Sequence, residues 1–136
     1  MKSQMTFVKT SGLPADAYCA VCPTRMALDR IAGKWPVLIV DALGERKLRF
    51  GELSRKIEGI SQKMLTLTLR QMEEDGLATR TIYPSVPVKV EYDLTSLGRS
   101  LQKLMHQIRA WSEFHVNDIE EARRRYKTAN QRSLNK

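Results

Sequence analysis

The two cysteines are the strongest nucleophiles of the sequence, and they lie close together near its start. Cys19 and Cys22 form a Cys-x-x-Cys motif, a spacing that permits an internal disulfide or a sensing thiol with its resolving partner. Pro23 predicts the first position of a helix, whose dipole would favour the thiolate of Cys22, and Arg25 follows one turn later. We therefore predict a reactive thiol at Cys22. A small buried side chain and a cross-link between subunits are the alternatives.

The same pair raises two other possibilities. A thiol-disulfide redox protein that uses Cys19 and Cys22 is the main alternative function, although a thioredoxin-like enzyme needs a βαβ unit that this sequence lacks. A zinc site needs two more ligands, and the two histidines, His106 and His115, lie far along the chain and nine residues apart. We predict no enzymatic activity, no catalytic residue, no metal and no cofactor.

A second group of residues has the chemistry to read DNA bases. Ser61 is a good N-cap for a helix that runs to about Asp75 and stops at Gly76. One side of this helix should face the core with Met64, Leu65, Thr68, Leu69 and Met72. The other side presents an amide, two cations, a hydroxyl and an aliphatic chain, from Gln62, Lys63, Arg70, Thr66 and Leu67.

Each outward group has a partner in the major groove. An amide pairs with adenine, Arg or Lys pairs with guanine, and Leu or a Thr methyl packs on the thymine methyl. No carboxylate interrupts this side before Glu73, whereas an ordinary solvated face carries mixed Glu and Lys and seldom an exposed residue such as Leu67. The pattern therefore favours insertion of residues 62–70 into double-stranded DNA.

Other groups around this helix suit phosphate contacts, which fix position without reading sequence. Arg49 precedes a short helix expected at residues 51–57, and Lys89 lies on the return strand of a hairpin. The hydroxyl of Ser61 stands at a helix N-terminus, where it can donate to phosphate. Further cations in the same region are Arg46, Lys47, Arg55 and Lys56.

The order of the expected elements defines the fold that positions these residues. Helices begin at Pro23 and near Pro36, the second ending at Gly44, and an extended piece at 48–50 precedes helices at 51–57 and 62–75. Strand-like runs at 78–83 and 88–94 flank a loop with two prolines, which is too stiff for a tight turn. This order predicts a winged helix-turn-helix of the α+β class, mainly α with a small β-hairpin wing.

A long final helix begins after Thr95 and carries a heptad stripe. The stripe consists of Leu97, Leu101, Leu104, Ile108 and Trp111. We expect it to pair two chains in a homodimer; the alternative is that it folds back on its own core. The expected divisions are an N-terminal arm (1–17), the winged helix-turn-helix domain (18–95), and the C-terminal dimerisation helix with a basic tail (96–136).

Composition and charge limit the function classes. The 136 residues suit one domain, no apolar run is long enough to cross a membrane, and no signal peptide is recognisable, so we expect a cytoplasmic protein. The net charge of +8 attracts polyanions. Residues 122–136 hold six basic groups and no acid, which leaves +2 elsewhere. This tail is either a solvated end or the binding segment of a nucleoid or RNA-binding protein.

Several motifs together resemble the HxlR-type family of bacterial transcription regulators. They are Cys22-Pro23, Gly33-Lys34-Trp35, residues 49–53 (RFGEL), 59–66 (GISQKMLT), 73–77 (EEDGL), 83–87 (YPSVP) and 90–95 (VEYDLT). The resemblance covers about residues 19–115. It implies a homodimeric winged-helix regulator, similar in architecture to MarR-type proteins, that binds near-palindromic operators of genes for reactive aldehydes, quinones, disulfide stress or hypochlorite.

The resemblance also bears on individual residues. Cys22 matches a cysteine that many family members use to sense an oxidant or small electrophile, and Cys19 is an addition to the pattern. Gln62 stands where the family has Gln or Pro, and Leu67 stands where it often has Gln. Because both lie on the side expected to read bases, the operator sequence does not carry over to this chain.

Overall fold

The computed structural model describes residues 15–135 and divides the chain into two compact units, residues 1–32 and 33–136. Most of the expected N-terminal arm, residues 1–14, and the last residue, Lys136, lie outside the described range. In the first unit, helix α1 spans Pro23–Ile31, with Cys22 as its N-cap and Pro23 in its first turn, as the sequence predicts. None of the α1 side chains is buried.

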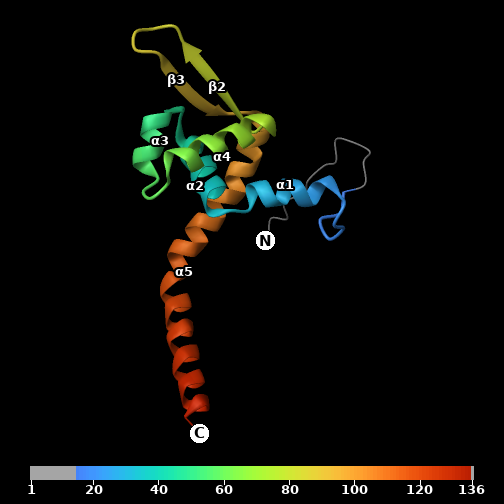
Figure 1. Ribbon diagram of the computed structural model, residues 1–136, viewed down its shortest axis with the longest axis vertical. Coiled ribbons are helices and arrows are strands. Elements are labelled where there is room, and N and C mark those ends of the chain that lie inside the picture. Colours follow the sequence, from blue (N-terminus) through green and yellow to red (C-terminus); the bar gives the residue numbers. More distant parts are fainter. Residues whose placement is uncertain (1–14, 136) are drawn as a thin grey trace, which may run out of the picture. The chain divides into compact units, whose positions relative to one another are not determined.

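The second unit has the element order of a winged helix-turn-helix, which confirms the predicted fold class (Figure 1). Its elements are α2 (Lys34–Glu45), β1 (Leu48–Arg49), α3 (Phe50–Lys56), α4 (Gln62–Glu74), β2 (Ala78–Tyr83), β3 (Lys89–Leu94) and α5 (Ser96–Leu134). The three strands form one antiparallel sheet in the order β1-β3-β2.

Aliphatic side chains from three helices form the core of this unit. The largest fully buried side chains are Ile39, Val40, Leu43, Leu53, Leu65 and Leu69, from α2, α3 and α4. On α4, Leu65 and Leu69 are spaced four residues apart, so they fall on one side of the helix. Burying an aliphatic side chain of this size contributes about 1.5–3 kcal/mol, which fixes α4 on the body of the unit.

Helix α2 is longer than the sequence predicts. We expected Gly44 to end it, but the helix continues to Glu45 and stops at the extended residue Arg46. Gly44 faces the Gln102 side chain of α5, and a Cβ atom on Gly44 would overlap that side chain. The glycine therefore serves the close packing of two helices, a tertiary role that cannot be recognised from local sequence.

Strands β2 and β3 form the wing, with a register that runs from Ala78 opposite Leu94 to Tyr83 opposite Lys89. The loop between them holds both prolines, as expected, and the Ser85 hydroxyl donates to the Pro87 carbonyl oxygen over 2.9 Å. Strand β1 adds only two residues to the other edge of β3. The wing is thus a two-stranded ribbon that projects from a minimal sheet (Figure 1).

Helix α5 packs on α2 near its start and then continues well beyond the other elements of the unit (Figure 1). Its buried residues are Gly98 and Met105, which lie outside the predicted heptad stripe. Within the stripe, Leu101 and Leu104 are half-buried, whereas Leu97, Ile108 and Trp111 are more than half exposed. Side chains next to the stripe therefore hold α5 on α2, and the stripe is partly covered at Leu101 and Leu104 but accessible at its other three residues.

A buried acid joins α2 to α5. The carboxylate of Asp41 accepts hydrogen bonds from Gln102 Nε2 (3.2 Å) and from Arg109 Nε, and it lies 3.0 Å from His106 Nδ1. Burial disfavours the charged carboxylate, but the bonds from Arg109 and His106 outweigh it and lower the pKa of Asp41. The three α5 residues are spaced four and three apart, so one side of the helix meets a single carboxylate.

Candidate nucleic-acid interface

Helix α4 begins as the sequence predicts. The Ser61 hydroxyl accepts a hydrogen bond from the Met64 N–H over 3.0 Å and so caps the helix. Ile60 and Leu65 are both buried, the arrangement of a hydrophobic staple across the first turn. Cap and staple together fix the direction in which the first turn of α4 points.

The two sides of α4 differ in burial. Leu65, Thr68, Leu69 and Met72 are buried. Met64 was also expected to face inward but is 37% exposed, because it lies about 100° around the helix from the fully buried Leu65. All five side chains expected to face outward are exposed, namely Gln62, Lys63, Thr66, Leu67 and Arg70.

The outward side of α4 carries accessible positive charge. Neither Lys63 nor Arg70 forms an ion pair with any described residue. The nearest acid along the helix, Glu73, is turned toward the wing and pairs with Arg80 of β2 at 3.3 Å. The exposed side of α4 thus remains basic and free of carboxylate over residues 62–70.

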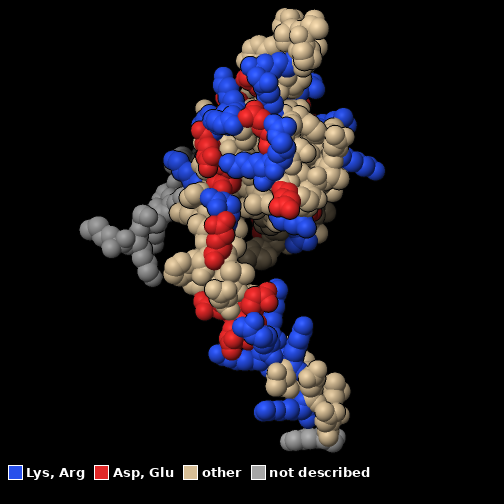
Figure 2. Space-filling model, turned by 90° about the vertical axis from the view of Figure 1, so that its left-hand side faces the viewer, with Lys and Arg blue, Asp and Glu red and all other residues tan. Residues whose placement is uncertain are grey.

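A second basic region lies around β1 and the start of α3. Arg46, Lys47, Arg49 and Arg55 line a shallow recess together with Glu52 and Glu91. Arg46 is committed to Glu52 at 2.7 Å, whereas Arg49 is exposed. Figure 2 shows this side of the molecule, where Lys and Arg side chains surround a few acidic ones. The recess suits phosphate contacts through its exposed cations.

On the wing, Lys89 is engaged within the protein. Its ammonium group lies 2.8 Å from Glu91 Oε1 and 5.0 Å from the centre of the Tyr83 ring. The hydrogen bond from Lys89 lowers the pKa of Glu91. The tip of the wing, by contrast, is apolar and fully exposed at Val86. The structure therefore brings Lys89 to the wing, as predicted, but with its charge already partnered.

The exposed stripe of α5 forms an apolar depression. Leu104, Gln107, Ile108 and Trp111 line it, and Phe114 one turn further on is 80% exposed. Gln107 was not predicted, because a polar residue does not stand out in a pattern of apolar spacing. Large apolar side chains gathered on one exposed helix face mark an interaction surface.

The two cysteines lie next to each other in the first unit. A turn closed by the Cys22 N–H and the Cys19 carbonyl oxygen (3.3 Å) holds them, and neither is in a disulfide. Such a turn keeps the two Cα atoms within about 7 Å, close to the span of a disulfide. Oxidation to an internal disulfide would therefore require little movement of the backbone.

The pKa of the Cys22 thiol is lowered, but Arg25 is not among the causes. A hydrogen bond from the Asp16 backbone N–H lowers the pKa of Cys22, and bonds to the side chain and backbone of Thr24 add to the effect. Arg25 instead donates to the carbonyl oxygens of Ala17 and Tyr18. The lowered pKa of Cys22 thus comes first from the backbone N–H of Asp16, which precedes α1, and then from Thr24 in the first turn of α1.

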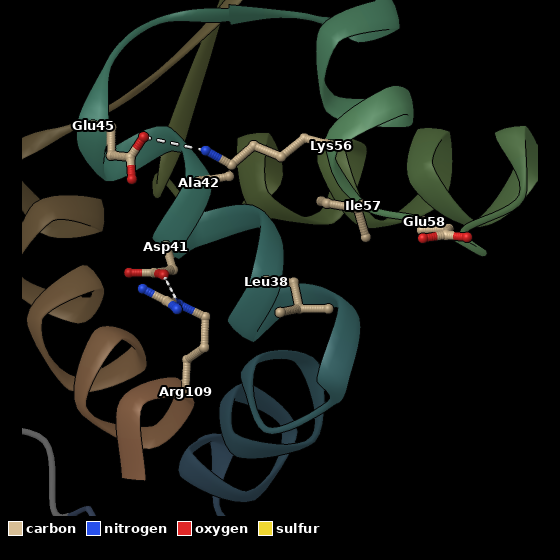
Figure 3. Close-up of a pocket in the computed structure, with 8 residues that line it drawn as sticks. All are labelled: Leu38, Asp41, Ala42, Glu45, Lys56, Ile57, Glu58 and Arg109. Atoms are coloured by element: carbon tan, nitrogen blue, oxygen red, sulfur yellow. Dashed lines mark hydrogen bonds and ion pairs between the residues drawn. The ribbon is translucent and has the colours of Figure 1, made fainter. Parts of the chain in front are cut away.

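A pocket of about 350 Å³ lies beside Asp41, between α2, the end of α3 and α5 (Figure 3). Its two cations already have acidic partners, since Lys56 pairs with Glu45 at 3.2 Å and Arg109 pairs with Asp41. These pairs join α2 to α3 and α2 to α5, so the charges of the pocket link neighbouring elements rather than offering a site to an anion.

Fold and surface together define a winged helix-turn-helix protein of the kind that regulates transcription. A family model described as HxlR-like helix-turn-helix matches residues 30–120, and the chain belongs to this family. It is a transcriptional regulator of the helix-turn-helix type. No helix among the described residues is long and apolar enough to span a membrane.

Individual relatives agree with this assignment. The chain is 41% identical over 102 residues to the HTH-type transcriptional regulator YybR of Bacillus subtilis, covering 75% of this chain and 82% of YybR. The structure of the transcriptional regulator YtfH from Salmonella typhimurium matches with a TM-score of 0.78 and 35% identity, over 82% of this chain and 99% of YtfH. The redox regulator HypR in its reduced form matches with a TM-score of 0.65 and 40% identity, over 73% and 98% of the two chains.

Proposed function

We propose that this chain binds operator sites in double-stranded DNA as a homodimer, with α4 in the major groove. The observation that carries the proposal is the exposed side of α4, which is basic and free of carboxylate while the opposite side is locked into the core. Gln62, Lys63 and Arg70 would bond to base edges, and Thr66 and Leu67 would pack on thymine methyl groups. Ser61 and Arg49 would hold phosphates.

Operator recognition is tested on a sequence selected from random duplexes by the purified protein. Arg70→Ala should weaken binding to that site by about 1–3 kcal/mol, because a lost bidentate base contact costs this much, and should have less effect on random DNA. Lys103→Ala is the matched control, an exposed cation on α5 with no ion-pair partner among the described residues. Equal losses of affinity for the operator and for random DNA would mean that Arg70 contacts a phosphate rather than a base.

Pairing of two chains through the α5 stripe supplies the second reading helix. A dimer on a palindromic site must place its reading helices about 34–36 Å apart, one turn of DNA. Leu104→Glu combined with Trp111→Ala places a charge in the apolar depression and should give a monomeric mass by light scattering. Leu134→Glu, a change at an exposed position near the end of α5, should leave the mass dimeric. A dimeric mass for the double variant would contradict the proposal that the α5 stripe forms the dimer interface.

A second proposed function is redox or electrophile sensing by Cys22. The acidified thiol and the adjacent Cys19 support it, as does the similarity to HypR, whose structures include a reduced and an oxidized form. A peroxide or hypochlorite would oxidise the thiolate to a sulfenic acid, which would condense with the Cys19 thiol to a disulfide and water. This change in residues 15–32 would alter DNA affinity.

The sensing proposal requires that Cys22→Ser abolish the response of DNA binding to oxidant, while Cys19→Ser leaves the first oxidation step intact. An unchanged response in Cys22→Ser would refute it. An insulin reduction assay addresses the alternative of a thiol-disulfide enzyme. Turnover that Cys22→Ser abolishes would favour the enzyme, and we expect none.

A further inference from the structure

The last part of α5 carries a dense group of cations that the winged domain does not use. We define the basic tail as residues 123–135. Its cations are Arg123, Arg124, Arg125, Lys127 and Arg132, all of them exposed. No acid follows Glu121 in the sequence, and the family match ends at residue 120. The basic tail is therefore a feature of this chain beyond the part that defines the family.

Internal ion pairs neutralise this charge only in part. Three arginines share two glutamates, with Arg124 and Arg125 both on Glu121 at 2.8 and 3.3 Å and Arg123 on Glu120 at 3.6 Å. Lys127 and Arg132 have no ion-pair partner among the described residues. All of these pairs are solvent-exposed, so each is weak and is readily exchanged for an external anion.

The arrangement of the cations indicates the partner. At 3.6 residues per turn, the five cations cover somewhat more than half of the helix circumference, and the remaining side holds Ala122, Tyr126, Ala129 and Ser133. This side is too small and polar for a membrane-binding helix, which needs a large apolar face. The major groove of DNA admits an α-helix and has phosphates on both walls, so it matches cations spread this widely, whereas the major groove of duplex RNA is too narrow.

The basic tail is also separate from the reading side of α4. Arg109 is the last α5 residue that bonds to α2, and a rise of about 1.5 Å per residue places Arg125 roughly 24 Å further along the helix. Figure 2 shows Lys and Arg side chains gathered on this lower part of α5. We propose that the basic tail is a second, sequence-independent DNA-binding surface that contacts phosphates of duplex DNA outside the segment read by α4.

The experiment uses full-length protein and a random-sequence 30-bp duplex, with binding followed by fluorescence anisotropy over a range of KCl concentrations. Changing Arg123, Arg124, Arg125 and Lys127 together to Gln should weaken binding at least about tenfold near 100 mM salt, because each lost phosphate contact removes the affinity gained from counterion release. Each lost contact also reduces the slope of log K against log salt by about 0.9. The slope of log K against log salt should therefore fall by about 2–4. Unchanged affinity and slope would overturn the proposal.

Two matched comparisons sharpen the test. Lys127→Gln should lower the slope by about 1, while Lys103→Gln, the same change on the same helix, should leave it unchanged. Glu120→Gln with Glu121→Gln releases the three arginines and should raise affinity for the random duplex. Equal circular dichroism of all variants shows that α5 remains helical.

The same variants separate this proposal from operator reading by α4. In the quadruple variant, the preference for operator over random duplex should persist, since α4 is unaltered. Arg70→Ala should reduce the salt slope on random DNA by at most about 1, the value for a single phosphate contact. The full-length protein and the quadruple variant are also compared on duplex RNA and on vesicles of anionic phospholipid. A larger loss of affinity for either of these than for duplex DNA would overturn the assignment of the partner.

Discussion

The Thr95 hydroxyl donates to the Gly76 carbonyl oxygen over 2.6 Å and so joins the start of α5 to the end of α4. The Thr95 hydroxyl oxygen also accepts from the Gly98 N–H at 3.1 Å, which caps α5, and the Thr95 N–H donates to the Leu77 carbonyl oxygen at 3.0 Å. One residue therefore caps α5 and holds the turn that follows α4.

Replacing Thr95 by Val removes both hydroxyl bonds while keeping the shape of the side chain. We expect a loss of about 1–2 kcal/mol in the free energy of unfolding, the usual contribution of an N-cap and a second side-chain hydrogen bond. Urea denaturation measures this difference. Thr95→Ser retains the hydroxyl and should stay close to the unaltered protein; equal destabilisation by both changes would contradict the role of the hydroxyl.

Gly98 allows α5 to approach the turn after α4. A Cβ atom at this position would overlap the Leu77 carbonyl oxygen, which belongs to the backbone and has little room to move. Gly98→Ala should therefore destabilise the unit by about 1–3 kcal/mol, as overpacking does, seen as a lower urea midpoint. Gly44→Ala is the matched comparison, since its Cβ meets the side chain of Gln102 and no backbone atom among its nearest contacts. Gln102 can turn aside at the cost of its bond to Asp41, so we expect a smaller loss of about 1 kcal/mol.

Asp41 makes the stability of the unit depend on pH. Its pKa is lowered in the folded protein, so its charged form adds stability that is full above the unfolded pKa of about 3.9 and is lost as the pH falls through the folded value. Asp41→Asn should cost about 1–3 kcal/mol at pH 7, and this difference should shrink below about pH 4. Urea unfolding from pH 7 to 3 tests it.

The control for Asp41 is its exposed counterpart. Glu113 binds the same guanidinium group of Arg109 at 2.8 Å but lies at the surface. Glu113→Gln should change stability by less than about 0.5 kcal/mol, because exposed pairs on one helix contribute little. The free energies of unfolding of Asp41→Asn and of the unaltered protein could also differ by the same amount down to pH 3. That result would mean that the charge on Asp41 is not the stabilising feature.

Thr24 helps to set the reactivity of Cys22. Because the hydrogen bonds from Asp16 and Thr24 lower the pKa of the Cys22 thiol, its alkylation should reach half of the maximal rate at a pH below the usual cysteine value of about 8.5. Thr24→Val should move that midpoint to higher pH, and Thr24→Ser should keep it. The rate is measured with iodoacetamide in a Cys19→Ser background. A midpoint that Thr24→Val leaves in place would exclude a contribution from its hydroxyl.

Local signals explain which parts of the fold the sequence predicts. Ser61 and Thr95 cap their helices by bonding to residues three positions on, and β2 begins and ends at the predicted residues. The outward side of α4 follows from helical periodicity alone. Such features depend on neighbours in the chain, so one sequence is enough to recognise them.

Features that depend on distant residues escaped prediction. Asp41 binds Gln102 and Arg109 across 61 and 68 positions of the chain. The available signal was a single acid within the apolar run of α2, which a buried ion pair explains. Gly44 was misread because a glycine that admits a neighbouring helix is indistinguishable, in sequence, from one that ends a helix.

Helix α5 is held on the winged unit along its first part, from Thr95 beside the end of α4 to Arg109 on α2. Its first part therefore cannot swing independently of α4. In the proposed dimer, a movement of the protruding part of α5 would be transmitted to α4 as by a stiff lever. A change in the angle between the two α5 helices would therefore change the distance between the two α4 helices.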